Sequence, residues 1–542
     1  MSFAKPNTDI MAARNWRWRH PPRAGGRPSP HGPARDGQSP DLSWRNASVP
    51  HFLGIDIGGS VIKSGLYDET GREVGVASMN DAAVAEHVGW SERDMDAMWR
   101  SVCGTIRELL DKTETPAADI AGISFSAHGK GLYLVDRDGK PFRNGIISSD
   151  NRAMPEVRAF KAAGVPDEIH PMSYQQLWPS HPAAILRWFK DNDPDAYGRI
   201  GHVLMAHDWI RYRMTGHLGC EVTNISGSNL LNVNTGTYDP ALLALFGIED
   251  IGERIPEPVG STESPAGLSA TAAAETGLKA GTPVFGGFFD VVSAAVCSGL
   301  ADDSRINVTM GTWTIVTWTT DHIPVSEYPY TWGRYCIPGR YFVHEGSPTN
   351  ASNLEWFVRT FMAGHDKPYA ECDRLLGTLP PASTPVQFLP YLFSSNLGDN
   401  LLGGFYGLAN AYGLGEVVQA VYEGICFSQQ VHLDRILALS GRGRQLRLTG
   451  GPAKSRPWMQ MVADIAALPI EVVHVEQSGC LGAAIAAAIG SGVYPSFIEA
   501  MNAMCPAASR IEPNLAHAEP YRRKYERFLE LAAALDRLSP AM

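Results

Sequence analysis

One stretch near residue 50 constrains the fold most, because it joins two apolar segments through a glycine corner. Residues 52–67 read Phe-Leu-Gly-Ile-Asp-Ile-Gly-Gly-Ser-Val-Ile-Lys-Ser-Gly-Leu-Tyr. Apolar and β-branched residues on both sides of Gly-Gly-Ser predict two antiparallel strands joined by a tight turn. Because glycine has no side chain, the backbone N–H groups of this turn can approach an anion closely.

Asp56 is the exceptional residue of the first strand. A carboxylate among strand hydrophobics must be paired or must act as a ligand, since burying an isolated charge is costly. Beside a turn of this size, it suggests a phosphate bridged by a cation. The plain alternative is a hairpin with an exposed Asp. We predict that the hairpin contributes these residues to a cofactor site: Asp56, Gly58, Gly59, Ser60 and Lys63.

The hairpin pattern returns in the second half of the chain. Residues 305–317 again predict a strand, a corner at Gly311-Thr312, and a second strand. A chain of 542 residues is too long for one core, and the recurrence predicts two similar domains that face a cleft. We expect a disordered extension over residues 1–50, one domain over 51–296, and a second over 297–542 that ends in an amphipathic helix.

A third loop of the same kind follows a predicted strand at 445–449. It reads Gly450-Gly451-Pro452-Ala453-Lys454-Ser455 and leads into a predicted helix at 457–468. It is not a Walker A loop, because alanine stands where that loop needs glycine before its lysine. Three places where backbone donors point into one cleft fit a nucleoside triphosphate better than a single phosphate.

Asp290, His128 and Lys130 are further candidates for chemistry. Asp290 follows Gly-Gly-Phe-Phe and begins a predicted helix, where Asp is an ordinary N-cap. The alternative is that its carboxylate accepts the proton of a substrate hydroxyl. His128 and Lys130 stand between glycines at a strand end, where they would line a cleft or belong to a solvated turn. A separate polar set lacks metal-ligand spacing and is interpreted as structural or substrate-lining: His181, His207, Asp208 and Glu221.

Composition excludes several classes of function. A net charge of −11 argues against nucleic acid as a main partner. No apolar run approaches the length of a membrane span. The eight cysteines contain no Cys-x-x-Cys, so neither structural zinc nor a disulfide framework is expected, and a cytoplasmic location fits. The Arg-, Pro- and Gly-rich residues 1–50 suggest an extension or an upstream start, with a basic binding arm as the alternative.

Taken together, these motifs resemble the FGGY family of carbohydrate kinases, in the actin-like ATPase superfamily. The resemblance runs from residue 52 to the C-terminal helix, and the motifs appear in the family's order. They are Gly54–Ser60, Trp90-Ser91-Glu92, Ser149-Asp150-Asn151-Arg152, Gly287-Phe288-Phe289-Asp290, Gly311-Thr312, Glu423-Gly424-Ile425, Thr449–Ser455 and Gly479-Cys480-Leu481-Gly482-Ala483-Ala484.

The resemblance implies an α/β fold of two actin-like (ribonuclease H-like) ATPase domains facing a central cleft. It implies Mg²⁺- and ATP-dependent phosphorylation of a terminal sugar hydroxyl, with Asp290 as catalytic base. It places Mg²⁺ near Asp56 and Asp290, held through water or ATP. The implied nucleotide contacts are Gly311, Thr312, Gly450, Gly451, Lys454 and Ser455, and the implied sugar contacts are His128, Lys130, Trp90, Glu92 and Asp290.

Within the family the chain is most similar to L-xylulose kinases, on stretches such as Ala127–Gly131 and His181–Trp188. We therefore expect a ketopentose to be phosphorylated on its primary hydroxyl, most simply L-xylulose to L-xylulose 5-phosphate. Many relatives have Gln-x-His or Arg-Glu where His128-Gly129-Lys130 stands, so other substrates stay open: another pentulose, 3-dehydro-L-gulonate, or a tetritol such as erythritol. A non-catalytic sugar-responsive regulator, a phosphohydrolase of the same superfamily, and a homodimer also stay open.

Overall fold

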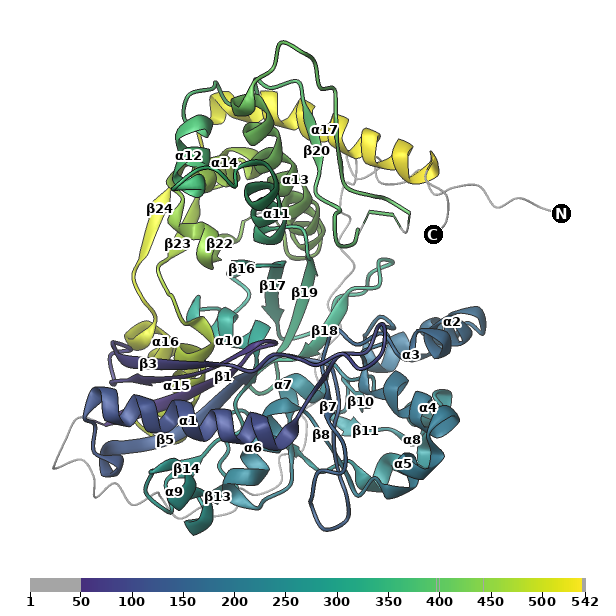
Figure 1. Cartoon of the computed structure of the whole chain (residues 1–542), viewed down its shortest axis with the longest axis vertical. Helices are drawn as coiled ribbons and strands as arrows, with labels where there is room; N and C mark the ends of the chain where they lie inside the picture. The colour runs from purple at the N-terminus through teal and green to yellow at the C-terminus, as the bar shows by residue number, and fades with distance from the viewer. Residues whose placement is uncertain (1–49, 396, 399, 442, 539–542) are drawn as a thin grey trace, which may run out of the picture. The chain divides into compact units, whose positions relative to one another are not determined.

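The computed structural model describes residues 50–395, 397–398, 400–441 and 443–538. The extension expected over residues 1–50 therefore lies outside the described residues, except for Pro50. Within the described part, helices surround two seven-stranded sheets (Figure 1). None of the helices in these ranges combines the length and apolar character that crossing a membrane requires.

The first sheet contains the opening hairpin. Its strand order is β13-β14-β5-β1-β2-β3, and β15 also pairs with β5. The strands are β1 (His51–Ile57), β2 (Val61–Tyr67), β3 (Glu73–Asn80), β5 (Ile120–Ala127), β13 (Ala266–Gly267), β14 (Pro283–Val284) and β15 (Phe288–Phe289). Strand β1 runs antiparallel to β2 and parallel to β5.

The second sheet repeats this arrangement. Its order is β18-β19-β17-β16-β22-β23-β24. The strands are β16 (Arg305–Met310), β17 (Thr314–Thr320), β18 (Thr331–Arg334), β19 (Tyr341–Ser347), β22 (Gln445–Thr449), β23 (Ile470–Val473) and β24 (Ala508–Ile511). The path β19-β17-β16-β22-β23 has the same parallel and antiparallel pairings as β3-β2-β1-β5-β14. The hairpin recurrence predicted from the sequence is thus a recurrence of whole sheets.

Helices fill the connections between the strands. Those of the first half are α1 (Met95–Thr113), α2 (Met154–Ala162), α3 (Val165–Ser173), α4 (Pro182–Asn192), α5 (Pro194–Arg199), α6 (Ala206–Thr215), α7 (Val222–Ile225), α8 (Pro240–Leu245), α9 (Ala270–Thr276) and α10 (Asp290–Cys297). Those of the second half are α11 (Ala351–Phe361), α12 (Pro368–Leu376), α13 (Leu414–Ser440), α14 (Arg456–Ala466), α15 (Ser478–Gly490), α16 (Phe497–Met504) and α17 (Leu515–Leu538).

Short strand pairs complete the described structure. They are β4 (Glu92–Arg93) with β7 (Gly145–Ile146), β6 (Tyr133–Val135) with β8 (His202–Leu204), β9 (Cys220–Glu221) with β12 (Pro258–Val259), β10 (Leu231–Asn232) with β11 (Thr237–Tyr238), and β20 (Gln387–Leu389) with β21 (Gly404–Tyr406). The polar segment 223–229 begins inside helix α7, whose N-cap is the Glu221 side chain, which accepts from the Asn224 N–H.

Helices α1 and α15 cover opposite faces of β1. Residues alternate in direction along a strand, so Leu53 and Ile55 share one face while Phe52 and Asp56 share the other. The first pair lies in an apolar cluster with residues of α1, and Phe52 lies in a cluster with residues of α15. A helix from near the C-terminal end of the chain therefore packs directly on the first strand.

Small residues make this packing close. A Cβ placed on Gly54 would overlap the carbonyl of Cys480, so β1 and the backbone of α15 are in direct contact. The alanines of α15 are buried in the same cluster, including Ala484 and Ala487. Any larger residue at these positions would push α15 away from the sheet.

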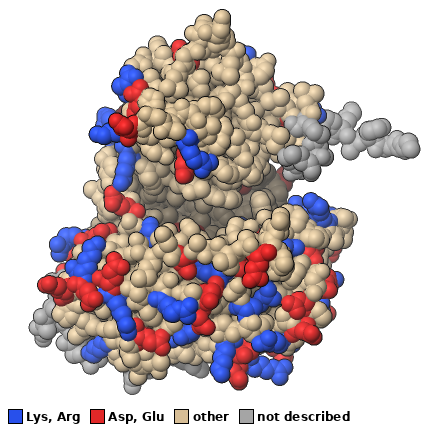
Figure 2. All heavy atoms as spheres, in the orientation of Figure 1, with Lys and Arg blue, Asp and Glu red and all other residues tan. Residues whose placement is uncertain are grey.

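Acidic and basic side chains are interspersed on the face drawn in Figure 2, over the lobe that carries α1. Ion pairs also join elements of this half of the chain, as Arg213 of α6 pairs with Asp96 of α1 at 2.9 Å. Neither sign gathers into a patch on this face.

Candidate active site

Two carboxylates meet at one edge of the first sheet. Strands β1 and β15 both run parallel to β5, with Asp56 and Phe288 each opposite Ser126. The carboxyl ends of parallel strands lie at the same edge of a sheet, where ligand sites form. Asp56 near the end of β1 and Asp290 just beyond β15 therefore flank the end of β5. The structure brings together two residues that are 234 positions apart in the sequence.

The Asp56 carboxyl is enclosed by the sheet and by the start of α15. Lys63 is its cross-strand partner, and Ser126 is its neighbour on β5. A Cβ on Gly479 would overlap the Asp56 carboxyl, so glycine is required at that helix position. Burial raises the pKa of Asp56, while the Lys63 charge and a hydrogen bond from Ser126 act in the opposite direction.

Asp290 is the first residue of α10. The N-cap position belongs to Phe289, which makes no side-chain cap, so Asp290 does not fill the N-cap role weighed from the sequence. Burial raises the pKa of Asp290 to about 7, and the negative charge of Asp56 adds to the rise. The Val291 N–H and the Lys130 ammonium lower it. A carboxylate that ionises near neutral pH has the basicity that proton abstraction from a hydroxyl needs.

Arg93 lies beneath the hairpin corner, and sequence reasoning missed it. Its Nη2 donates to the carbonyl of Gly58 at 3.1 Å and also to the carbonyl of Gly59. Its Nε lies 3.2 Å from the Asp81 carboxylate, and both side chains are buried. With the two carbonyls turned toward this cation, the corner is held in place from below. In the sequence Arg93 lies in the polar run Ser91–Asp94, and nothing there relates it to Gly58.

Lys63 connects the hairpin to α15. Its Nζ donates to the side-chain oxygen of Gln477 at 3.0 Å, and Gln477 is the N-cap residue of α15. The residues of the corner itself, Gly59 and Ser60, are exposed. Their backbone and hydroxyl groups are therefore accessible to a ligand, whereas the Lys63 ammonium already has a protein partner.

The second corner and the glycine loop after β22 lie side by side. Strands β16 and β22 are parallel, with Thr309 opposite Thr449, so the loops that follow both strands share one edge. Gly450 has a φ of +107°, and a Cβ there would overlap the carbonyl of Met310. Only glycine permits this approach. Gly311 and Gly451 complete the pair of loops, and Gly451 is exposed.

Thr312, Lys454 and Ser455 have partners of their own. The Thr312 carbonyl accepts from Ser352 Oγ at 3.1 Å. Ser455 Oγ donates to Asp373 at 2.7 Å and accepts from the first turn of α14, which makes Ser455 the N-cap of that helix. Lys454 forms an exposed ion pair with Glu476 at 2.7 Å. The Ser455 hydroxyl thus has a structural role in positioning the loop.

His128 is buried and not part of a solvated turn. Its Nε2 lies 3.0 Å from the hydroxyl of Tyr133. Burial, together with the positive charge of Arg93, lowers the pKa of His128 to about 4, so the imidazole is neutral at physiological pH. Its Nδ1 lies 3.3 Å from the Gly129 carbonyl, so both ring nitrogens have partners within the protein.

Glu92 and Trp90 belong to a buried ion-pair network. The Glu92 carboxylate lies 2.6 Å from Arg152 Nη2 and 3.4 Å from Arg143 Nη2. The Arg152 guanidinium also pairs with Asp150 at 2.9 Å and stacks on the Trp90 ring at 3.8 Å. The network joins two motifs that are separate in the sequence, Trp90–Glu92 and Asp150–Arg152. It also engages the Glu92 carboxylate before any sugar binds.

Thr223 connects a buried carboxylate to the segment that carries Asp290. Its hydroxyl donates to Glu221 Oε2 at 2.7 Å and accepts from the backbone N–H of Phe289 at 2.9 Å. Glu221 also accepts from Ser261 Oγ at 2.7 Å, and burial raises the pKa of Glu221 to about 7. Sequence reasoning found Glu221 but not this link, because nothing in the spacing of 221–223 indicates residue 289.

Comparison with known proteins identifies the family. Residues 51–297 match the N-terminal domain, and residues 306–491 the C-terminal domain, of the FGGY family of carbohydrate kinases. The chain belongs to the FGGY family of carbohydrate kinases. This finding confirms the resemblance drawn from the sequence motifs, and the chain is accordingly a carbohydrate kinase, a phosphotransferase with an alcohol group as acceptor.

Two relatives show which kinases this FGGY kinase is similar to. It is 43% identical to the L-xylulose/3-keto-L-gulonate kinase of Escherichia coli (strain K12), over 90% of this chain and 97% of that protein. It is 40% identical to a protein of Pasteurella multocida (strain Pm70) named "Probable L-xylulose kinase", over 90% and 99% of the two chains.

A ligand-bound xylulose kinase from Lactobacillus acidophilus superimposes with a TM-score of 0.84 over 90% of this chain and 98% of that one, at 24% identity. That likeness confirms the expected fold of two actin-like domains.

The FGGY kinase site takes residues from both sheets. The Phe289 ring, next to Asp290, lies 6.0 Å from the ring of His344 on β19 of the second sheet. The segment that carries Asp290 therefore contacts the second sheet as well as the first. Water must be excluded from such a site, since water competes with the sugar as acceptor.

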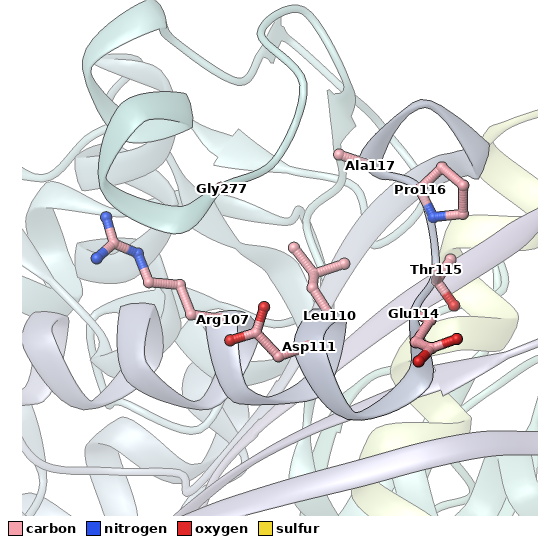
Figure 3. Close-up of a pocket in the computed structure, with 8 residues that line it drawn as sticks. All are labelled: Arg107, Leu110, Asp111, Glu114, Thr115, Pro116, Ala117 and Gly277. Carbon is pink, nitrogen blue, oxygen red and sulfur yellow. The ribbon is translucent and has the colours of Figure 1, made fainter.

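A separate surface pocket of the FGGY kinase contains none of these groups. It lies where α1 ends, and Figure 3 shows the residues that line it: Arg107, Leu110, Asp111, Glu114, Thr115, Pro116, Ala117 and Gly277. Its polar groups come from one helix end and the turn that follows. Nothing in its lining resembles the paired carboxylates of the candidate active site.

Proposed function

We propose that this FGGY kinase transfers the γ-phosphoryl group of ATP to the primary hydroxyl of a ketopentose, converting L-xylulose to L-xylulose 5-phosphate. The observation that carries the proposal is the position of Asp290. Its carboxyl begins a helix beside Asp56 and has a pKa raised to about 7. The names of the relatives at 43% and 40% identity support the choice of sugar.

In the proposed mechanism, Asp290 accepts the proton of the sugar hydroxyl as that oxygen attacks the γ-phosphorus in line. The bond from the γ-phosphorus to the β–γ bridging oxygen breaks, and ADP leaves. At the two corners, the backbone N–H groups of Gly59, Ser60 and Thr312 donate to the phosphates, since those of Gly58 and Gly311 already bond the carbonyls of Val61 and Trp313. Gly450 and Gly451 border the adenosine, and His128 and Lys130 contact the sugar. Arg93 holds the first corner through the carbonyls of Gly58 and Gly59, and Ser455 holds the glycine loop through Asp373.

The residues present fit a metal that reaches the site with ATP. Among the described residues, no group of three ligating side chains could hold an ion alone. Mg²⁺ is typically bound by one or two carboxylates, with substrate phosphates and water completing the shell. Asp56 and Asp290 would supply these carboxylates, directly or through water. When bound, the ion would neutralise charge that develops on the phosphates.

An ADP-release assay across L-xylulose, other pentuloses, a tetritol and 3-keto-L-gulonate tests the proposal. We expect ADP release that depends on the sugar and is fastest with L-xylulose. ADP release without sugar would indicate a phosphohydrolase, and no release with any sugar would indicate a binding protein. Asp290→Asn should lower turnover about 10²- to 10⁴-fold while the sugar still binds. The exposed Asp321→Asn serves as the matched control and should have normal turnover.

A cytoplasmic location and a domain boundary near residue 297 are also proposed. All eight cysteines are free, which suits a reducing compartment, and ATP is available there. The boundary is supported by the match of the two family domains to 51–297 and 306–491. Expression with a cytoplasmic fractionation assay and limited proteolysis would test both points.

A further inference from the structure

Strand β18 is the edge strand of the second sheet (Figure 1), and residues of the first half of the chain cover its outer edge. It pairs with β19 along one side. On the other side, the Trp332 N–H donates to the carbonyl of Tyr174 at 3.0 Å, and Gln175 Nε2 donates to the carbonyl of Trp332 at 2.5 Å. Tyr174 is the residue at which α3 ends. The second sheet is therefore bonded directly to an element of the first half.

Arg334, two residues further along β18, makes a second contact of this kind. Alternate residues of an antiparallel strand direct their N–H groups away from the partner strand, so the Arg334 N–H also faces the first half of the chain. It donates to Ser226 Oγ at 3.1 Å. The Arg334 guanidinium donates to the carbonyls of Val233 and Asn234 at 3.0 and 2.9 Å. Gly236 has a φ of +74°, and a Cβ there would overlap this guanidinium.

The Ser226 hydroxyl connects β18 to Thr223. Ser226 is fully buried and is the C-cap residue of α7. Its hydroxyl accepts from the Arg334 N–H and donates to the Thr223 carbonyl at 3.0 Å. The Thr223 side chain accepts from the N–H of Phe289, the residue before Asp290. A continuous series of hydrogen bonds through Ser226 and Thr223 therefore leads from the second sheet to the start of α10.

Ring packing gives a second contact along the same path. A Cβ on Gly333 would overlap the Phe342 ring and would lie 2.9 Å from Ser226 Oγ. Phe342 belongs to β19, and its ring centroid lies 6.3 Å from that of the Phe289 ring. Phe289 is thus joined to the second sheet through its ring and, by way of Thr223, through its backbone N–H. A shift of Phe289 relative to this sheet would disturb both contacts.

We propose that Ser226 is a positioning residue of the kinase reaction, which holds Asp290 in register with the second sheet. The inference rests on the proposed function, in which Asp290 is the base and loops of the second sheet bind ATP. The base and the phosphoryl group to be transferred then belong to different sheets, and in-line transfer requires the two to be aligned. The bonds from Arg334 to Ser226 and from Ser226 to Thr223 supply this alignment.

Steady-state kinetics of the full-length protein with L-xylulose and MgATP tests the inference. Ser226→Ala should lower kcat about 10- to 100-fold, because small displacements of a catalytic group are costly in rate. The KM for each substrate should change by less than about 3-fold, since uniform binding is retained. Gly333→Ala keeps the Ser226 hydroxyl but places a methyl group against it, and should lower kcat in the same way.

Ser228→Ala is the matched control. Ser228 is buried in the same segment, and its hydroxyl donates to the Ile225 carbonyl and accepts from the Leu230 N–H. The control therefore removes a buried hydroxyl whose two bonds stay within the segment 225–230. It should retain a normal kcat. Circular dichroism of each variant confirms that it is folded.

A double-mutant cycle with Thr223→Val tests the path itself. That change removes the hydroxyl that accepts from Phe289 and keeps the carbonyl that accepts from Ser226. If Ser226 acts on Asp290 through Thr223, adding Ser226→Ala to Thr223→Val should lower kcat by less than about 2-fold further.

Three outcomes would overturn the inference while leaving the proposed function intact. They are a normal kcat in Ser226→Ala, an equal loss of kcat in Ser226→Ala and Ser228→Ala, and fully additive losses in the double-mutant cycle. Normal turnover in Asp290→Asn would instead refute the proposed function, and Ser226 would then have no base to position.

Discussion

The hydroxyl of Thr223 accepts a hydrogen bond from the backbone N–H of Phe289, with 2.9 Å between oxygen and nitrogen. Because Asp290 is the next residue, this bond fixes the start of α10 relative to the buried Glu221 carboxyl, to which Thr223 donates. The base is thus positioned by residues that need not touch the substrate. The Glu221 side chain is also the N-cap of helix α7, where it accepts from the Asn224 N–H.

Thr223→Val should reduce kcat more than it raises the KM for ATP. The change leaves the Phe289 N–H and a lone pair of the Glu221 carboxyl without a partner, which costs about 1–3 kcal/mol. We expect a roughly 10-fold or greater loss of kcat, since misplaced catalytic groups are costly in rate. Thr223→Ser keeps the hydroxyl and should behave nearly as wild type. Steady-state kinetics would contradict the positioning role if both variants had the same kcat.

The pH dependence of kcat/KM should show an acidic limb near pH 7. Asp290 acts as base only when ionised, and burial with the Asp56 charge raises its pKa to about 7. Activity should therefore rise as pH increases through this value. Lys130 lowers the pKa of Asp290, so Lys130→Met should move the limb to higher pH, and Lys130→Arg should not. A limb near pH 4 in the wild type would contradict the raised pKa.

The same pKa shift has a consequence for stability. The folded-state pKa of Asp290 lies above its unfolded value of 3.8, so the folded protein loses stability as pH rises from about 4 to about 7, and above that the loss is complete. Asp290→Asn removes this loss. Thermal denaturation should therefore show a higher Tm for Asp290→Asn at pH 8, with a smaller difference at pH 5. A lower Tm at pH 8 would show that the carboxylate is stabilised by unseen partners.

Gly479→Ala should abolish activity although alanine is the better helix former. Glycine to alanine inside a helix ordinarily stabilises by about 1 kcal/mol, but here the added Cβ would overlap the Asp56 carboxyl. We expect loss of kcat and a displaced Asp56. Gly198 is also helical and has open space around it, so Gly198→Ala is the matched control and should retain full activity. Equal activity of the two variants would show that α15 shifts freely.

Arg93→Met should destabilise the protein strongly and weaken ATP binding. The change leaves Asp81 buried without its partner, a loss that typically costs about 3–5 kcal/mol. It also removes the donor to the Gly58 and Gly59 carbonyls. Arg72→Met breaks a pair whose arginine is 75% exposed, and should cost less than about 1 kcal/mol. Urea denaturation would measure the free energy of unfolding, and nucleotide titration would measure the affinity for ATP. A loss of stability in Arg72→Met as large as that in Arg93→Met would contradict the role assigned to Arg93.

Local pattern was sufficient to predict the two hairpins and the glycine loop. In each, apolar residues at strand spacing meet a glycine corner, and the resulting strand, turn and strand are fixed by neighbours in the sequence. Asp290 could be proposed for the same reason, since a carboxylate between a strand and a helix start has few roles. These elements depend on contacts a few residues apart, which periodicity encodes.

Contacts between distant segments could not be predicted in this way. The role of Arg93 depends on its burial under Gly58, and that of Ser455 on its partner Asp373. Glu92 was proposed as a sugar contact from family likeness, whereas the structure engages its carboxylate with Arg152. Each of these facts requires the fold first, because no spacing in the chain relates the two partners.

The packing of α15 on β1 and β2 determines when the first lobe can be finished during synthesis. The Cys480 thiol lies against the carbonyl of Lys63, 417 residues earlier in the chain. At ribosomal rates of about 5–20 residues per second, helix α15 is synthesised roughly 20–80 seconds after β2. Until then, the apolar face around Phe52 has no permanent cover. The first sheet therefore cannot be completed until nearly the whole chain has been synthesised.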